Sequence, residues 1–269
     1  MFLDTDGATL YYEVRGTGPL LLVAQSGEGG ADRSTDLVNR LTDRYTVVTY
    51  DRRGLSRSAL ADPERGVTME EHADDVHRLL TRLTDEPALM LGCSMGAAIG
   101  LHLAVAHPGQ LRTLVAHDPV SPSLLPTGPR AGHAAELVHL QEVYREGGLQ
   151  AALPEIARAL GIDPARQETE PDLTPMPLTP GRVADFGFFI ARDFTAVVEA
   201  ELDQEALRTS PVRIVPAGGA VTAPDVFVGQ CAHRLAGIVG REVVAFPGGH
   251  NGNTTHPRAY AARLREVLA

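Results

Sequence analysis

The chain has 269 residues, of which 24 are basic and 34 acidic, so its formal net charge is −10. All 24 basic residues are arginine, which excludes a lysine Schiff base and a Walker-type phosphate loop. The length fits one α/β domain or two small ones with a large buried core, and the acidic balance argues against nucleic acid or an anionic membrane as a partner.

Nothing in the sequence points to a membrane-bound or secreted protein. No apolar run reaches about 18 residues, so we expect no transmembrane helix. Residues 1–7 carry two aspartates and no basic region, unlike a signal peptide. Cys93 and Cys231 suggest neither a disulfide framework nor a metal site. We therefore expect a cytoplasmic protein, a monomer or homodimer, that needs no cofactor and no metal.

Short apolar runs alternate with longer stretches of helical periodicity. Alternation over Thr9–Val14 predicts an edge strand, whereas continuous apolar runs predict strands covered on both faces. Such runs lie at Leu20–Ala24, Thr46–Tyr50, Ala88–Leu91, Arg112–His117, Val212–Ala217 and Glu242–Phe246. Helices are expected at about Asp32–Thr42, Thr68–Leu83, Ser94–His107 and Pro224–Ile238, and from about His256 onward. This order predicts a mostly parallel twisted sheet with helices on both faces.

The segment from Pro119 to Ser210 breaks this alternation. It contains helical pieces and a proline-rich stretch but no strand pattern; the pieces are Ala131–Glu146, Gly148–Leu160 and Arg182–Leu202, and the stretch is Pro171–Pro180. We interpret residues 121–204 as a helical cap inserted into a core domain of residues 1–120 and 205–269. The alternative is a loose linker between two domains, but too few strands follow it to build a second one.

The strongest chemical signal is Gly92-Cys93-Ser94-Met95-Gly96, a G-x-S-x-G pattern between a predicted strand and a predicted helix. A serine on so sharp a turn adopts a strained backbone conformation and points its hydroxyl into solvent. The small flanking residues let the strand and the helix approach each other closely. The next amide, that of Met95, lies at a helix N-terminus and is suited to stabilise an oxyanion. An ordinary glycine-rich turn is the alternative.

A nucleophilic serine needs a base and a carboxylate that orients the base. Of ten histidines, His250 lies in a glycine-rich loop just after the last predicted strand and is the candidate base. Two carboxylates remain open as the acid. Asp118 directly follows the strand Arg112–His117, at the sheet edge where ligand chemistry collects, and we favour it over Asp225, which lies near the start of a later helix.

Two further loops follow early strands. The glycine-rich turn after Leu20–Ala24 makes the Ser26 amide the candidate second oxyanion donor, with Gly27 next. The loop Asp51–Ser58 carries Arg52, Arg53 and Arg57, which we interpret as a solvated loop rather than as contacts to an anionic substrate.

Together these residues resemble the α/β-hydrolase superfamily over nearly the full chain: Gly54–Ser58, Gly92–Gly96, His117-Asp118-Pro119 and Gly249-His250. Within it the chain is most similar to the fungal zearalenone lactonases, which open a macrolactone. That resemblance places the triad acid after the strand that follows the nucleophile helix, at Asp118. The lactonases have glutamate there and a substrate-binding tryptophan in the cap, whereas this chain has aspartate and no tryptophan.

The resemblance implies a serine hydrolase with Ser94, Asp118 and His250 as triad and the Ser26 and Met95 amides as oxyanion hole. With an apolar pocket under the cap, the expected substrate is a small molecule: a hydrophobic ester or lactone of medium size, such as a zearalenone-like macrolactone. Rival hypotheses are other hydrolase-fold chemistry on a polyketide-like compound (carbon–carbon hydrolysis or cyclisation), a ligand receptor on this scaffold, and a cofactor-free oxygenase or perhydrolase.

Overall fold

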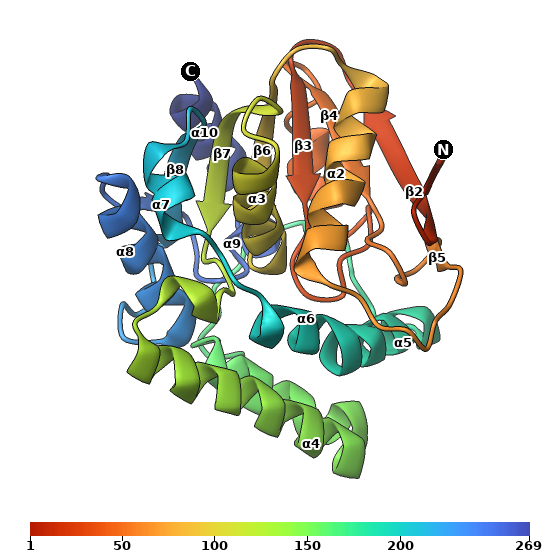
Figure 1. The fold of residues 1–269 in the computed structure, drawn as a ribbon, viewed down its shortest axis with the longest axis vertical. Coiled ribbons are helices and arrows are strands. Elements are labelled where there is room, and N and C mark those ends of the chain that lie inside the picture. Colours follow the sequence, from red (N-terminus) through yellow and green to blue (C-terminus); the bar gives the residue numbers. More distant parts are fainter.

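The computed structural model describes residues 1–269 as one sheet flanked by helices, with a group of further helices beyond one end of the strands (Figure 1). The strands are β1 (Phe2–Thr5), β2 (Ala8–Arg15), β3 (Leu20–Ala24), β4 (Thr46–Tyr50), β5 (Ala59–Leu60), β6 (Ala88–Cys93), β7 (Leu111–His117), β8 (Arg213–Gly219) and β9 (Val244–Phe246). The helices beside the sheet are α1 (Thr35–Asn39), α2 (Met69–Leu83), α3 (Met95–Ala106), α8 (Phe227–Val239), α9 (Gly252–Thr255) and α10 (Pro257–Leu268).

The sheet has the order β1-β2-β4-β3-β6-β7-β8-β9, with β5 paired to β2. All pairs from β4 to β9 are parallel, whereas β1, β2 and β5 pair antiparallel. The sequence prediction of a mostly parallel sheet with helices on both faces is confirmed. The prediction of an edge strand at Thr9–Val14 is wrong, because β2 lies between β4 and the unpredicted strand β1, which holds the edge. β1 is four residues long, too short to show a clear pattern.

Two apolar cores explain why the central strands read as continuous hydrophobic runs. Successive residues of β3, such as Leu21 and Leu22, face opposite cores, so both faces of the strand are buried. The larger core packs α2, α3 and α8 against one face, and the smaller core packs α1 and α10 against the other. No helix of the chain combines the length and the hydropathy required to cross a bilayer.

The helices between β7 and β8 are the insertion predicted in the fold class. They comprise η1 (Pro122–Leu124), α4 (Thr127–Ala159), α5 (Pro180–Phe188), the π-helical turn η2 (Phe189–Asp193), α6 (Phe194–Glu199) and α7 (Gln204–Thr209). The two helical pieces predicted around Gly148 form a single α4 with a break at that residue, whose φ of 65° is left-handed. In Figure 1, α4, α5 and α6 lie beyond the ends to which the parallel strands point.

The loop after β4 differs from its prediction as a solvated loop. Arg52 and Arg53 are 1% and 2% exposed. Both Asp75 oxygens lie 2.7 Å from the Arg53 guanidinium, and Arg52 Nη2 lies 2.8 Å from Asp193 Oδ2. Of the three arginines in this loop, only Arg57 stays partly exposed, and it pairs with Asp51. Two arginines are buried here because carboxylates distant in sequence neutralise them, which a local pattern cannot reveal.

A glycine sets the distance between β3 and α3. A Cβ built on Gly96 would overlap the carbonyl oxygen of Ala24, so Gly96→Ala forces helix and sheet apart. We expect the free energy of unfolding to fall by about 1–3 kcal/mol, as for other overpacked cores. In contrast, Gly237 lies exposed on α8 with open space around its Cβ position, so Gly237→Ala should raise stability by up to about 1 kcal/mol. Urea unfolding at pH 7 measures both, and equal stabilities of the two variants would contradict this packing.

Candidate active site

Ser94 occupies the turn between β6 and α3. Its backbone angles, φ 56° and ψ −112°, are rare for a residue with a side chain and cost roughly 1–3 kcal/mol. The Ser94 amide donates to the His117 carbonyl at 2.9 Å, which fixes the turn against the end of β7. A Cβ on Gly92 would lie 2.5 Å from the Gly96 carbonyl oxygen, so the strand and helix can meet only with glycine there. Ser94 thus stands at a helix N-terminus on the carboxyl edge of the sheet.

Asp118 follows β7 and is also left-handed, with φ 44°. Its amide donates to the Ala217 carbonyl at 2.9 Å, and its carboxylate is fully buried. Asp118 Oδ2 accepts from the Thr222 hydroxyl at 2.9 Å and lies 3.4 Å from His250 Nδ1. The other carboxylate weighed, Asp225, is exposed in the loop before α8, where its carbonyl accepts from the Gln230 side chain. The structure therefore brings Asp118 to His250 and leaves Asp225 at the surface.

His250 lies in the loop between β9 and α9. Gly248, with φ 79°, and Gly249 precede it, and Gly219 at the end of β8 leaves room for the Gly249 backbone. The side chains of Ser94 and His250 are both buried, but they form no hydrogen bond with each other, and the 3.4 Å contact to Asp118 is long. Catalytic hydrogen bonds commonly tighten only when substrate is bound.

The groups around Asp118 favour its ionised form. Burial alone would raise the pKa of Asp118, but the neighbouring His117 and His250 imidazoles and the Thr222 hydroxyl lower it to about 2. Burial lowers the pKa of His117 to about 4, so this imidazole is neutral at pH 7. Burial also raises the pKa of the Cys93 thiol to about 12, which makes this neighbour of Ser94 a poor nucleophile.

The backbone amides of Ser26 and Gly27, in the loop after β3, have no acceptor within the chain, and neither has that of Met95, the first residue of α3. Ser26 and Met95 are the two predicted oxyanion donors. Both follow strands that end at the same edge, because β3 and β6 are parallel neighbours with Ala24 opposite Gly92. No three His, Cys, Asp or Glu side chains converge in a way that could hold a metal ion.

A cavity of about 580 Å³ borders His250, and Ser94 is not among its lining residues. Most residues that line this cavity are polar or glycine, because the chain after α4 contributes charged side chains. These residues include Asp163, Arg166, Gln167, Glu168, Asn251 and His256, with Ile162 and Val221 as the apolar ones.

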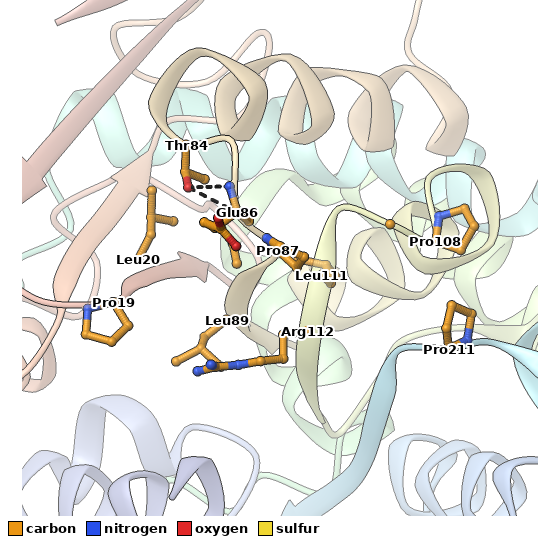
Figure 2. A pocket seen from close by; sticks show the side chains of 12 residues that line it. Pro19, Leu20, Thr84, Glu86, Pro87, Leu89, Pro108, Leu111, Arg112 and Pro211 are labelled. Atoms are coloured by element: carbon orange, nitrogen blue, oxygen red, sulfur yellow. Dashed lines mark hydrogen bonds between the residues drawn. The ribbon is translucent and has the colours of Figure 1, made fainter.

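A second cavity, of about 560 Å³, lies at the opposite end of the strands (Figure 2). Its residues include Leu20, Leu89 and Arg112, at or near the starts of β3, β6 and β7. Ligand chemistry in open α/β sheets occurs at the carboxyl ends of strands. We therefore assign no part of the candidate site to the cavity in Figure 2.

The family model described as the alpha/beta hydrolase fold matches residues 19–196 of this chain. The chain belongs to the alpha/beta hydrolase family. The matched region includes Ser94 and Asp118 and ends within α6.

Two relatives of this hydrolase and one solved structure of similar fold are informative. An uncharacterized hydrolase, YraK, from Bacillus subtilis is 36% identical over 270 residues, covering 99% of this chain and 94% of its own. A zearalenone hydrolase from Bionectria ochroleuca is 34% identical over 116 residues, covering 42% of this chain and 44% of its own. The solved structure of an esterase from Exiguobacterium antarcticum superposes with a TM-score of 0.79 at 18% identity, covering 99% of this chain and 98% of that one. The resemblance to this family is confirmed.

Sequence reasoning missed the residues that surround the Asp118 carboxylate. Thr222 and the Gly219 amide donate to it, and His117, the residue before Asp118, is buried in the core. The paired glycines at the end of β8 were a usable signal, because a Cβ on Gly218 would lie 3.0 Å from Asp118 Oδ1. In this hydrolase the end of β8 lacks an acid, and the carboxylate from β7 lies against it.

The buried His117 makes stability depend on pH. Because its pKa is lowered to about 4, the folded chain binds fewer protons than the unfolded chain between pH 4 and about 6.5. The contribution of the neutral imidazole to the free energy of unfolding is complete above pH 6.5. It is lost as the pH falls to 4, at up to about 1.4 kcal/mol per pH unit. His117→Phe, whose ring fits beside Phe246 and Tyr260, should flatten the pH dependence.

Urea unfolding between pH 7 and pH 4 measures this difference. His139→Gln is the control, because His139 is exposed and should leave the slope unchanged. Parallel curves for wild type and His117→Phe would show that the imidazole is not buried in its neutral form.

Proposed function

We propose that this chain is a serine hydrolase that cleaves an ester or lactone through an acyl-enzyme intermediate. The observation that carries the proposal is the contact between His250 Nδ1 and Asp118 Oδ2, 3.4 Å, beside the strained turn that holds Ser94. The order Ser94, Asp118, His250 along the chain is the one expected for this fold.

In the proposed first step, His250 takes the proton of Ser94 as its hydroxyl oxygen attacks the carbonyl carbon. Asp118 keeps the imidazole in the tautomer that leaves Nε2 free to accept and stabilises the imidazolium that forms. The tetrahedral intermediate collapses as His250 gives the proton to the leaving oxygen. Water then attacks the acyl-enzyme with the same base, which releases the acid and restores Ser94.

The amides of Ser26 and Met95 are proposed to donate to the oxyanion. Both lack an acceptor within the chain, and Met95 adds the partial positive charge of a helix N-terminus. Loss of one such donor typically slows the reaction about 100- to 1,000-fold. The mechanism needs no metal and no cofactor.

The proposed substrate is a medium-sized ester or lactone, and a zearalenone-like macrolactone remains a candidate through the partial relative. The polar cavity supports one refinement. Since His250 protonates the leaving oxygen, a cavity beside His250 receives the leaving-group side of the substrate. We infer that this side of the substrate carries polar substituents. We also propose residues 121–204 as the cap that selects the substrate.

Labelling with a fluorophosphonate, located by mass spectrometry, tests the triad. We expect rapid labelling at Ser94, none in Ser94→Ala or His250→Ala, and labelling slowed by up to about 10⁴-fold in Asp118→Asn, which disturbs the histidine tautomer. Asp225→Asn is the matched control and should label at the wild-type rate, because Asp225 is exposed and the carboxylate beside His250 is that of Asp118.

An unlabelled wild-type chain that is folded would overturn the acyl-enzyme mechanism and favour a ligand receptor on this scaffold. Equal slowing in Asp118→Asn and Asp225→Asn would overturn the assignment of the acid.

A further inference from the structure

The buried Arg52 lies against the loop that carries Ser26. Its Nη1 donates to the Gln25 carbonyl at 3.2 Å, and its Nη2 donates to the Gly27 carbonyl. Gly29, with φ 36°, leaves space for the guanidinium, because a Cβ there would overlap it. One side chain therefore holds the carbonyls on both sides of Ser26.

The contact with Gln25 fixes the direction of the Ser26 amide. The Gln25 carbonyl and the Ser26 N–H belong to one planar trans peptide, in which the two groups point in opposite directions. A guanidinium on the oxygen therefore turns the N–H away from Arg52. A positive charge on the oxygen also polarises the peptide and strengthens the N–H as a donor.

Arg52 is also held by the inserted helices. Asp193, the last residue of η2, places Oδ2 2.8 Å from Arg52 Nη2, and its Oδ1 lies 3.1 Å from His72 Nε2 of α2. Burial would raise the pKa of Asp193, but Arg52 and His72 hold it below its usual range. Asp193 ends a π-helical turn, a conformation that is frequent at functional sites.

We propose that Arg52 is a positioning residue that orients and polarises the Ser26 amide as an oxyanion donor. Through the contact between Asp193 and Arg52, the orientation of this amide depends on the position of η2. The inference rests on the proposed function for the reaction that it serves, but the anchoring of the loop can be measured without any reaction.

The neighbouring Arg53 is a matched control. It is as buried as Arg52 and also pairs with a buried carboxylate, Asp75, but it contacts neither Gln25 nor Gly27. Arg52→Met and Arg53→Met each remove one buried charge of the same kind, so both lower stability. Only Arg52→Met removes the contacts to the loop.

The experiment compares wild type, Arg52→Met, Arg52→Lys and Arg53→Met by fluorophosphonate labelling and by hydrolysis of p-nitrophenyl butyrate. We expect Arg52→Met to slow labelling and lower kcat by roughly 10- to 100-fold, below the loss for a whole oxyanion donor, with KM nearly unchanged. Arg52→Lys keeps a positively charged donor but not the guanidinium fork, and should restore part of the rate. Arg53→Met should label within about threefold of wild type, since it leaves the donor in place.

Hydrogen exchange of the peptide covering residues 25–31 supplies the reaction-independent readout. The Gly29 amide bonds the Ser26 carbonyl at 2.9 Å, and its exchange should become faster in Arg52→Met but not in Arg53→Met. If a single variant does not fold, the pairs Arg52→Met with Asp193→Leu and Arg53→Met with Asp75→Leu remove both charges and permit the same comparison.

Two results would overturn the proposal: equal labelling rates in Arg52→Met and wild type, or equal slowing in Arg52→Met and Arg53→Met. If wild-type Ser94 takes no label and cleaves no ester, the proposed function fails. In that case hydrogen exchange still tests whether Arg52 anchors the loop. Faster exchange in Arg52→Met but not in Arg53→Met supports the anchoring, and unchanged exchange refutes it.

Discussion

The left-handed turns at Ser94 and Asp118 are the constraint on which the rest of the site depends. They end two neighbouring parallel strands, and the Ser94 amide bonds the carbonyl just before Asp118. Each turn is unfavourable for a residue with a side chain, so surrounding packing has to hold it. Gly92 and Gly96 provide the close approach of β6 and α3, and the β7–β8 pairing continues through the Asp118 amide. Sheet stability is thereby used to hold a serine and a carboxylate at one edge.

Local patterns in the sequence predicted the sheet and the main residues of the candidate site. The strands Leu20–Ala24 and Thr46–Tyr50 were predicted to the residue, because both are continuous apolar runs that two cores bury. The glycine-flanked Ser94 and the strand-end position of Asp118 are likewise local signals. Whether these residues catalyse a reaction stays a prediction, since geometry alone assigns no activity.

What could not be predicted depends on partners distant in sequence. Arg52 and Arg53 share one loop, yet their buried carboxylates lie 141 and 22 residues away in η2 and α2. Likewise, Thr222 lies 104 residues from the Asp118 carboxylate that it supports. The polar cavity beside His250 arises where the chain after α4 meets the loop after β9. Such pairs decide whether a charge is solvated or buried, and no local periodicity encodes them.

The most direct test of the account is a single turnover with p-nitrophenyl dimethylcarbamate. Its carbamoyl-serine is hydrolysed slowly because the carbonyl is a poor electrophile, so the covalent intermediate accumulates. The account predicts a burst of one p-nitrophenolate per chain and a dimethylcarbamoyl group on Ser94, found by mass spectrometry of the digested protein. A folded chain that cleaves p-nitrophenyl butyrate but gives no burst, or carries the group on another residue, would contradict it.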